Sequence, residues 1–235
     1  MYSLNKTILK NVSTNPYLGV LFSEDLTWSN HIEKITKKAN STLGFLRRNL
    51  RRCPTKCKKT AYLSLVRSTL EYGSIIWDPF LKKDIEAIER IQRSAARFIT
   101  GDYRSRTPGS VQNLLEKLNL PSLQDRRKHL RLVFFYKLVE GLVPAMPYQN
   151  FLTSSKPGRL VKAKKNSDFI SKNPVSNFVR NNDRTFNIPH YKSEQYKNSF
   201  FVKTCIEWNS LDNSVVNIKS VNSFRTTIEK QLNQQ

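Results

Sequence analysis

The sequence has 235 residues, of which 38% are hydrophobic and 11% aromatic, enough apolar material for one domain of ordinary size or somewhat more. This composition excludes a wholly disordered chain. The formal net charge of +22 favours phosphate-rich partners, with nucleic acid ahead of an acidic membrane surface.

The N-terminal part, residues 1–27, contains one short β-prone run. Tyr17 to Phe22 is apolar, follows Pro16 and ends at a polar turn, so we expect a strand or hairpin arm too short to build a sheet. The other predicted parts are a helical domain over residues 28–141, an extended polar loop or linker over 142–191, and a C-terminal helical segment over 192–235.

A first helix is predicted after the turn, with Ser29 as its N-cap. Its apolar face carries Ile32, Ile35, Ala39, Leu43, Leu46 and Leu50. Its opposite face carries Lys34, Lys37, Lys38, Arg48 and Arg52. The pattern indicates an amphipathic helix whose polar side is cationic.

A second predicted helix opens at Pro54 and ends near Gly73. The residues expected on its apolar face are Cys57, Ala61, Leu65, Val66 and Leu70. A connector around Trp77, expected to be buried, leads to a third helix from about Leu81 to Thr100, with Gly101 as its stop signal.

The outer face of the third helix has two readings. Arg90 and Arg93 follow Glu86 and Glu89 by four residues, so ion pairs along the helix would make this face a solvated surface rather than a binding surface. Arg97 has no acid at that spacing, which leaves it as a candidate for binding.

Further helices are predicted around Val111–Leu118 and from Ser122 to Glu140, the latter with a capping arrangement of Ser122 and Asp125. The expected core face of the longer one carries Leu123, Leu130, Phe134 and Leu138. Residues 142–191 are rich in Pro, Asn, Ser and Lys, which makes them too polar and irregular for a core.

The C-terminal segment returns to a helical pattern. One helix is expected to carry Phe200, Phe201, Thr204 and Trp208. A last helix is expected to follow Ser220 as its cap and to carry Val221, Phe224, Ile228 and Leu232. Exposed aromatic residues beside basic ones could stack on nucleic-acid bases. Because these recur at helical spacing, core packing is the favoured reading.

The densest positive charge lies between Glu33 and Glu71, where the sequence contains no carboxylate, so we expect no local neutralisation there. The candidate nucleic-acid-binding residues in this stretch are Lys37, Lys38, Arg47, Arg48, Arg51, Arg52, Lys56, Lys58, Lys59 and Arg67. Arg97 joins them from the third helix, and Arg126 and Arg127 from a second basic patch further along the chain.

The sequence presents no catalytic constellation. It has no glycine-rich phosphate loop, no Gly-x-Ser-x-Gly elbow and no His-Glu-x-x-His pair, and its acids do not suggest a two-metal site. The spacing of Cys53 and Cys57 could supply half of a zinc site, but the histidines offer no second pair. We therefore expect no enzyme activity, no metal, no cofactor and no small-molecule substrate.

The cysteines also indicate the compartment. Cys53, Cys57 and Cys205 leave one thiol over in any disulfide scheme, which favours a reducing environment. No stretch has the character of a signal peptide or a membrane span. The expectation is a soluble intracellular protein, nuclear or cytoplasmic, that does not associate with membranes.

An ordered series of short segments resembles one known family. The segments are Tyr17-Leu18-Gly19-Val20, Leu26-Thr27-Trp28, His31-Ile32, Lys37-Lys38-Ala39-Asn40, Leu43 to Arg48, Leu65 to Gly73, Ile76-Trp77-Asp78-Pro79, Ile85 to Glu89, Ile91 to Arg97, Pro121-Ser122-Leu123 with Arg126-Arg127, and Glu207-Trp208-Asn209. Together they look like the region downstream of the catalytic palm in reverse transcriptases of non-LTR, LINE-type (jockey-like) retrotransposons. The resemblance covers nearly the whole chain.

The resemblance implies a mainly α-helical, thumb-like bundle with a short N-terminal β element that corresponds to the edge of the palm near the primer grip. The family's aromatic-x-Asp-Asp signature does not occur in the sequence, and no endonuclease domain is present. The chain then looks like a catalytically inactive thumb and C-terminal fragment of an RNA-directed DNA polymerase. Its implied partners are RNA or RNA–DNA duplex, bound without sequence preference, and the missing palm.

Two other readings remain open at this point. The chain could be a helical protein-interaction module, in which apolar residues that would face a palm make the contact. It could also be a structural remnant without a function.

Overall fold

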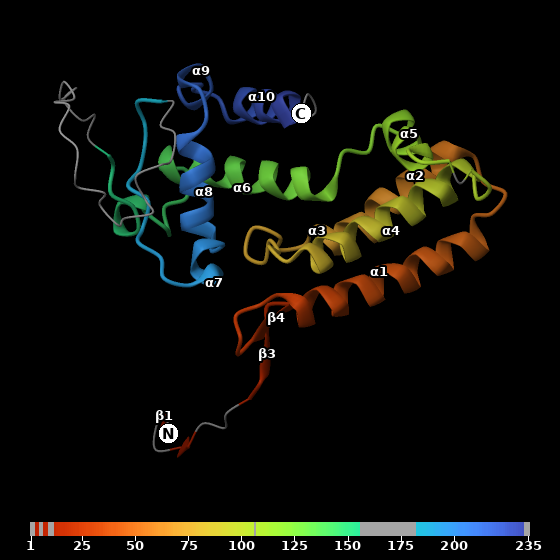
Figure 1. Cartoon of the computed structure of the whole chain (residues 1–235), viewed down its shortest axis with the longest axis horizontal. Helices are drawn as coiled ribbons and strands as arrows, with labels where there is room; N and C mark the ends of the chain where they lie inside the picture. The colour runs from red at the N-terminus through yellow and green to blue at the C-terminus, as the bar shows by residue number, and fades with distance from the viewer. Residues whose placement is uncertain (1–2, 5–6, 9–11, 106, 156–181, 233–235) are drawn as a thin grey trace, which may run out of the picture. The chain divides into compact units, whose positions relative to one another are not determined.

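The computed structural model describes residues 3–4, 7–8, 12–105, 107–155 and 182–232 (Figure 1). The fold is mainly helical with a short N-terminal antiparallel hairpin, which confirms the predicted fold class. The chain forms two compact units, Met1–Gln124 and Asp125–Gln235, called unit 1 and unit 2 below. The division falls near the start of one helix, whereas the sequence placed boundaries after residues 27, 141 and 191.

The N-terminal strands pair as hairpins. Strand β1 (Ser3–Leu4) pairs with β2 (Thr7–Ile8), and β3 (Thr14–Tyr17) pairs with β4 (Val20–Ser23), both antiparallel. Between β3 and β4, Leu18 and Gly19 have φ angles of 46° and 85°, as a tight two-residue hairpin turn requires. The hairpin reading of this apolar run is therefore correct.

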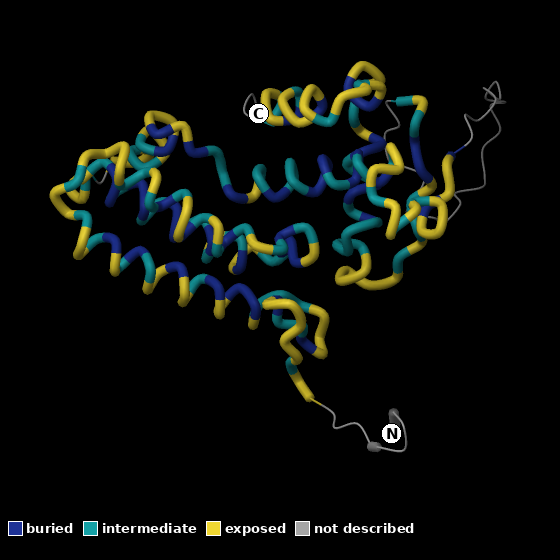
Figure 2. The backbone as a smooth tube through the Cα atoms, turned by 180° about the vertical axis from the view of Figure 1, so that it is seen from behind, coloured by how far each residue is buried: buried dark blue, intermediate teal, exposed yellow. Residues whose placement is uncertain are grey.

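Helix α1 (Ser29–Asn49) packs along α4 (Lys82–Thr100) and forms one wall of the unit 1 core (Figure 1). Figure 2 shows buried and exposed positions alternating along α1. The buried apolar residues of α1 are the predicted ones, Ile32, Ile35, Ala39, Leu43 and Leu46, and Leu50 packs partly against them. The predicted amphipathic face is confirmed.

The predicted cap of α1 is wrong. Ser29 is already the first helical residue and Trp28 holds the cap position without a side-chain hydrogen bond. The Ser29 hydroxyl instead donates to the buried Asp84 carboxylate of α4 at 2.7 Å. A partner far away in the sequence has taken the hydroxyl that local spacing assigned to capping.

The second predicted helix is a composite of α2 (Thr55–Ala61), a π-helical stretch η1 (Tyr62–Arg67) and α3 (Ser68–Glu71). Its predicted face is partly wrong. Val66 and Leu70 are buried as expected and Ala61 packs partly against the core, but Cys57 and Leu65 are exposed, and Tyr62 is buried in addition. The wider π-turn changes the angular spacing of side chains, so a regular helical period misplaces the apolar face. The Tyr62 hydroxyl donates to Gln92 of α4 at 2.9 Å.

The third predicted helix is confirmed as α4, which ends at Gly101 with a left-handed φ of 76°. The predicted short helix is α5 (Ser110–Lys117) and the longer one is α6 (Leu123–Val139). The Gln92 amide donates to the Pro121 carbonyl at 2.9 Å, so a buried side chain of α4 holds the segment that leads into α6.

Unit 2 is built from most of α6, a 3₁₀ turn η2 (Tyr148–Asn150) and the helices α7 (Glu194–Lys197), α8 (Phe200–Asn209), α9 (Asn213–Val216) and α10 (Val221–Leu232). Its core is rich in aromatic rings, with Tyr136 stacked on Phe224 at 4.4 Å and Trp208 tilted against Phe135 at 5.2 Å. Trp208 and Phe224 are fully buried, which confirms the core reading for both of them.

The predicted core face of α6 is partly wrong. Leu130 and Phe134 are only half-buried, whereas Leu132, Phe135 and Tyr136 are buried. Nearly continuous apolar sequence lets more than one face fit a helical period, so the tertiary contacts decide which face is inside.

The described ends of the 142–191 segment also differ from the prediction. Leu152 and Phe186 are buried in the unit 2 core, and a β-bridge joins Ser154 to Phe186. Sparse apolar residues in a polar stretch can still anchor it when a core offers them a place. Residues 156–181, for which the sequence predicts loop, lie outside the described part of the chain.

His31 joins the hairpin to the core of unit 1. Its Nδ1 accepts a hydrogen bond from the Leu21 backbone N–H at 3.2 Å, and its ring meets Trp77 edge-on at 5.1 Å. The side chain is 1% exposed. Burial, with a smaller effect of Lys34, lowers the pKa of His31 from 6.5 to about 4.

We predict that unit 1 loses stability as the pH falls from about 6.5 towards 4, because His31 takes up a proton more readily when unfolded than when folded. At about 1.4 kcal/mol per pKa unit, the loss reaches about 3 kcal/mol. Urea unfolding followed by circular dichroism across this pH range measures it. The His31→Asn variant offers an amide acceptor without titrating and should show a flatter profile. Equal pH dependence in both proteins would contradict the assignment to His31.

Candidate nucleic-acid interface

One face of α1 carries a row of exposed side chains, separated in the sequence by alternating steps of four and three residues. They are Lys34, Lys38, Ser41, Phe45 and Arg48, here called the α1 stripe. Residues at this spacing lie above one another on a helix, on the side away from the buried face. At 1.5 Å per residue the stripe is about 21 Å long. Three further exposed cations follow, Arg51 and Arg52 in the turn after α1 and Lys56 in the first turn of α2.

The cations of the stripe have no acid to neutralise them. Within the described residues, no carboxylate lies within ion-pair distance of Lys34, Lys38 or Arg48, and the same holds for Arg51, Arg52 and Lys56. The Arg48 guanidinium lies back along the helix, over Gly44. An unneutralised row of cations on a helix attracts polyanions.

Both ends of the acid-free stretch are neutralised from outside it, contrary to the sequence expectation. Lys37 forms an ion pair with Glu33 one turn earlier, and Arg67 lies 3.8 Å from Glu71 one turn later. The sequence expectation considered only acids inside the stretch. An ion pair between residues four apart on a helix can also use the acids that bound the stretch, here Glu33 and Glu71. The predicted binding residues Lys37 and Arg67 therefore already have intramolecular partners.

Arg47 and Arg97, two other predicted binding residues, hold the fold together. Arg47 Nη2 donates to the Ser94 carbonyl at 3.0 Å and to the Ser94 hydroxyl, which ties α1 to α4. Arg97 Nη1 donates to the Ser105 carbonyl at 3.0 Å and more weakly to that of Asp102, which fixes the loop after α4. Charge-assisted bonds of this kind give both side chains a structural role.

The predicted lysines of α2 differ among themselves. The Lys58 ammonium lies over the Phe98 ring, 5.6 Å from its centroid, in a cation–π contact. Lys59 is half-buried, and only Lys56 is exposed. Lys56 is therefore the most exposed of the three.

The predicted ion pairs on α4 are wrong. Arg93 pairs with Glu86, two turns away, rather than with Glu89. Glu89 instead accepts a hydrogen bond from the Gln124 backbone N–H at 2.9 Å. Arg90 is exposed and has no acid partner in the described part of the chain.

The second predicted basic patch, on α6, is not a uniform exposed surface. Arg126 is half-buried and Arg127 is fully buried. A buried guanidinium cannot reach a phosphate group outside the protein, so the prediction for Arg127 is not supported.

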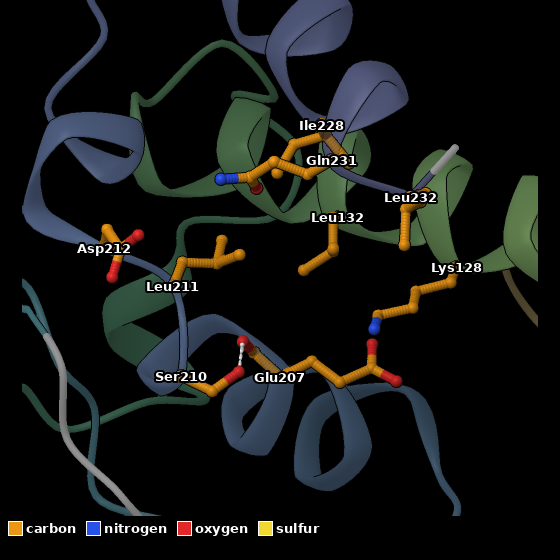
Figure 3. A pocket seen from close by; sticks show the side chains of 9 residues that line it. All are labelled: Lys128, Leu132, Glu207, Ser210, Leu211, Asp212, Ile228, Gln231 and Leu232. Carbon is orange, nitrogen blue, oxygen red and sulfur yellow. Dashed lines mark hydrogen bonds between the residues drawn. The ribbon is translucent and has the colours of Figure 1, made fainter. Parts of the chain in front are cut away.

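A cavity of about 360 Å³ lies in unit 2 between α6, α8 and α10 (Figure 3). Its walls combine leucine and isoleucine side chains with charged groups, and Figure 3 shows Lys128 and Glu207 pointing towards one another. Arg131 Nη2 donates hydrogen bonds to both oxygens of the Glu207 carboxylate, at 2.7 Å to Oε1 and 2.6 Å to Oε2. This carboxylate is held in an ion pair, which leaves it poorly placed to act as an acid or a base.

The wider search for chemical groups covers only the described part of the chain. There, no group of three or more His, Cys, Asp or Glu side chains is placed to hold a metal ion. Burial raises the pKa of the Cys205 thiol to about 12, which makes it a poor nucleophile.

No helix in the described segments has the length and apolarity needed to cross a membrane.

The sequence-based site prediction omitted three residues of the stripe, Lys34, Ser41 and Phe45. All three could have been found, because the alternation of four- and three-residue steps passes through Lys34, Lys38, Ser41, Phe45 and Arg48 in order. Comparisons with models of known protein families, with curated proteins and with solved structures give no match.

Neighbouring arginines on α1 should differ in their effect on stability. Replacing Arg47 by Ala removes a charged donor from Ser94, for which we expect a loss of about 1–3 kcal/mol in the free energy of unfolding. Replacing Arg48, exposed and unpaired, should change it by less than about 0.5 kcal/mol. Urea titration of both variants makes the comparison. Similar losses in the two would show that the Arg47–Ser94 contact does not stabilise the fold.

Proposed function

We propose that this chain binds RNA or RNA–DNA duplexes through their phosphate backbone, without reading sequence. The observation that supports this most directly is the row of exposed cations without acid partners, which runs along α1 and into the turn after it. Such cations contribute affinity by neutralising phosphates and releasing counterions. Phosphate contacts position a nucleic acid but carry no sequence information.

The resemblance to the post-palm region of LINE-type reverse transcriptases also supports the proposal. Its segments Lys37-Lys38-Ala39-Asn40 and Leu43 to Arg48 lie on α1, the helix that carries the stripe. In this proposal the chain corresponds to a polymerase thumb and C-terminal part without catalytic activity. The aspartate signature of that family is absent from the sequence.

A second candidate, a protein-interaction module, is favoured by an exposed apolar area at the other end of unit 1. Tyr17 and Leu18 at the β3–β4 turn are 65% and 74% exposed, and Tyr72 is 62% exposed. The Tyr72 hydroxyl donates to the Leu18 backbone carbonyl at 3.0 Å, so the Tyr72 ring lies against the β3–β4 turn. Contiguous exposed apolar groups are typical of contact surfaces.

Salt dependence separates the two candidates. For phosphate binding, the logarithm of the association constant should fall linearly with the logarithm of salt concentration, by about 0.9 for each phosphate neutralised on a B-form duplex. Fluorescence anisotropy with duplexes of unrelated sequence should give similar affinities. Affinity independent of salt would argue for the interaction module instead.

The residues responsible can be tested against a control variant that loses the same amount of charge. Replacing Arg48, Arg51 and Arg52 together by Gln should make the salt dependence shallower, by about 0.9 for each phosphate that is no longer neutralised. The control replaces three exposed cations elsewhere in unit 1, Lys82, Arg90 and Lys117, and removes the same charge. If the control reduces the slope as much as the first variant, net charge rather than the α1 surface controls binding.

We also predict no primer extension on an RNA template with Mg²⁺ or Mn²⁺. Two-metal polymerisation requires carboxylates that hold the metal ions, and among the described residues no group of three or more His, Cys, Asp or Glu side chains is placed to do so. Incorporation of nucleotides by the purified chain, retained through independent purifications, would overturn the inactive-fragment reading.

A further inference from the structure

The stripe contains one side chain that phosphate binding does not explain. Phe45 is 56% exposed, and among the described apolar residues of unit 1 it belongs neither to the core nor to those packed against it. A single exposed apolar residue is ordinary on a protein surface. The position of Phe45 distinguishes it, because it lies on the stripe between the cations Lys38 and Arg48, with the polar residues Ser41 and Asn49 beside it.

The neighbours of Phe45 on the stripe suit a nucleic-acid strand. Lys38 and Ser41 precede it and Arg48 follows it, with Arg52 in the turn beyond, all exposed. Lys38 precedes Phe45 by seven residues on α1, which places it about 10 Å away along the helix, and Arg52 follows beyond the end of the helix at Asn49. A strand whose phosphates meet these cations would pass its bases near the phenyl ring. Cationic grooves with aromatic side chains that stack on bases are the usual device for holding single strands.

We propose that the α1 stripe binds an unpaired stretch of RNA or DNA beside a duplex, and that a base of this stretch stacks on Phe45. The inference rests on the proposed function and adds the structural class of the ligand. Inside a duplex both faces of a base are already stacked, and exposing one costs unpairing and unstacking energy. A ring fixed on a helix surface therefore meets an unpaired base far more readily than a paired one.

The experiment compares the full chain and its Phe45 variants on a blunt RNA–DNA duplex and on the same duplex with a single-stranded extension. Phe45→Ala should weaken binding to the extended duplex by about five- to 150-fold, the range for loss of one stacked base. Binding to the blunt duplex should change little. Phe45→Trp should retain the preference for the extended duplex, since its ring also stacks.

Two controls separate stacking from other effects. Phe45→Leu keeps an apolar side chain but has no ring, so it should behave like Phe45→Ala. Leu65→Ala truncates an exposed apolar residue on η1, 50% exposed, and should have no effect. Because Phe45 carries no charge, Phe45→Ala should lower affinity without changing the slope against salt, whereas Arg48→Gln should make that slope shallower.

The outcomes distinguish this inference from the function on which it rests. Salt-dependent binding that is equal for wild type and Phe45→Ala on the extended duplex overturns the stacking inference and leaves the proposed function standing. Full affinity in Phe45→Leu also overturns it, because an apolar contact without a ring would then suffice. Absence of binding by the wild-type chain to either duplex overturns both.

Discussion

The burial of one face of α1 is the constraint on which the rest of unit 1 depends. Ile32, Leu43 and Leu46 pack against α4 and the η1 region, and each fully buried side chain of this kind contributes about 1.5–3 kcal/mol. With that face fixed in the core, helical geometry fixes the opposite face in solvent. The cations at the remaining positions are thus exposed as a consequence of core packing, and the acid-free sequence around them leaves them charged and without partners.

The buried polar groups of unit 1 connect elements that apolar packing alone would leave free to slide. Tyr62 donates to Gln92, and Gln92 donates to the Pro121 carbonyl, so a single side chain of α4 fixes both η1 and the segment before α6. A buried amide with unsatisfied groups would cost about 1–3 kcal/mol, so these partners specify one arrangement. Tyr62, the first residue of η1, is fully buried.

Local rules predicted the regular elements and failed where a distant residue intervened. The apolar face of α1, the left-handed Gly101 stop and the β3–β4 hairpin follow from spacing and turn chemistry that the sequence displays directly. Which side chains of η1 point into the core could not be predicted in this way, since a π-turn leaves no mark in a hydrophobic pattern. The burial of Phe186 was also missed, because its place in a core depends on helices elsewhere in the chain.

The same distinction governs the candidate site. Counting charges treats Arg47 and Arg48 as equivalent, yet the first donates to Ser94, 47 residues away, while the second meets no acceptor within the described segments. A cation is available to a polyanion only where it is exposed to solvent and the fold supplies no hydrogen-bond acceptor or acid partner for it. This depends on the tertiary structure and cannot be obtained from composition. Since the arginines that bind phosphate in our proposal are not those that hold α1 to α4, binding can be removed while the fold is kept. The interface is therefore open to mutational analysis without loss of the core that supports it.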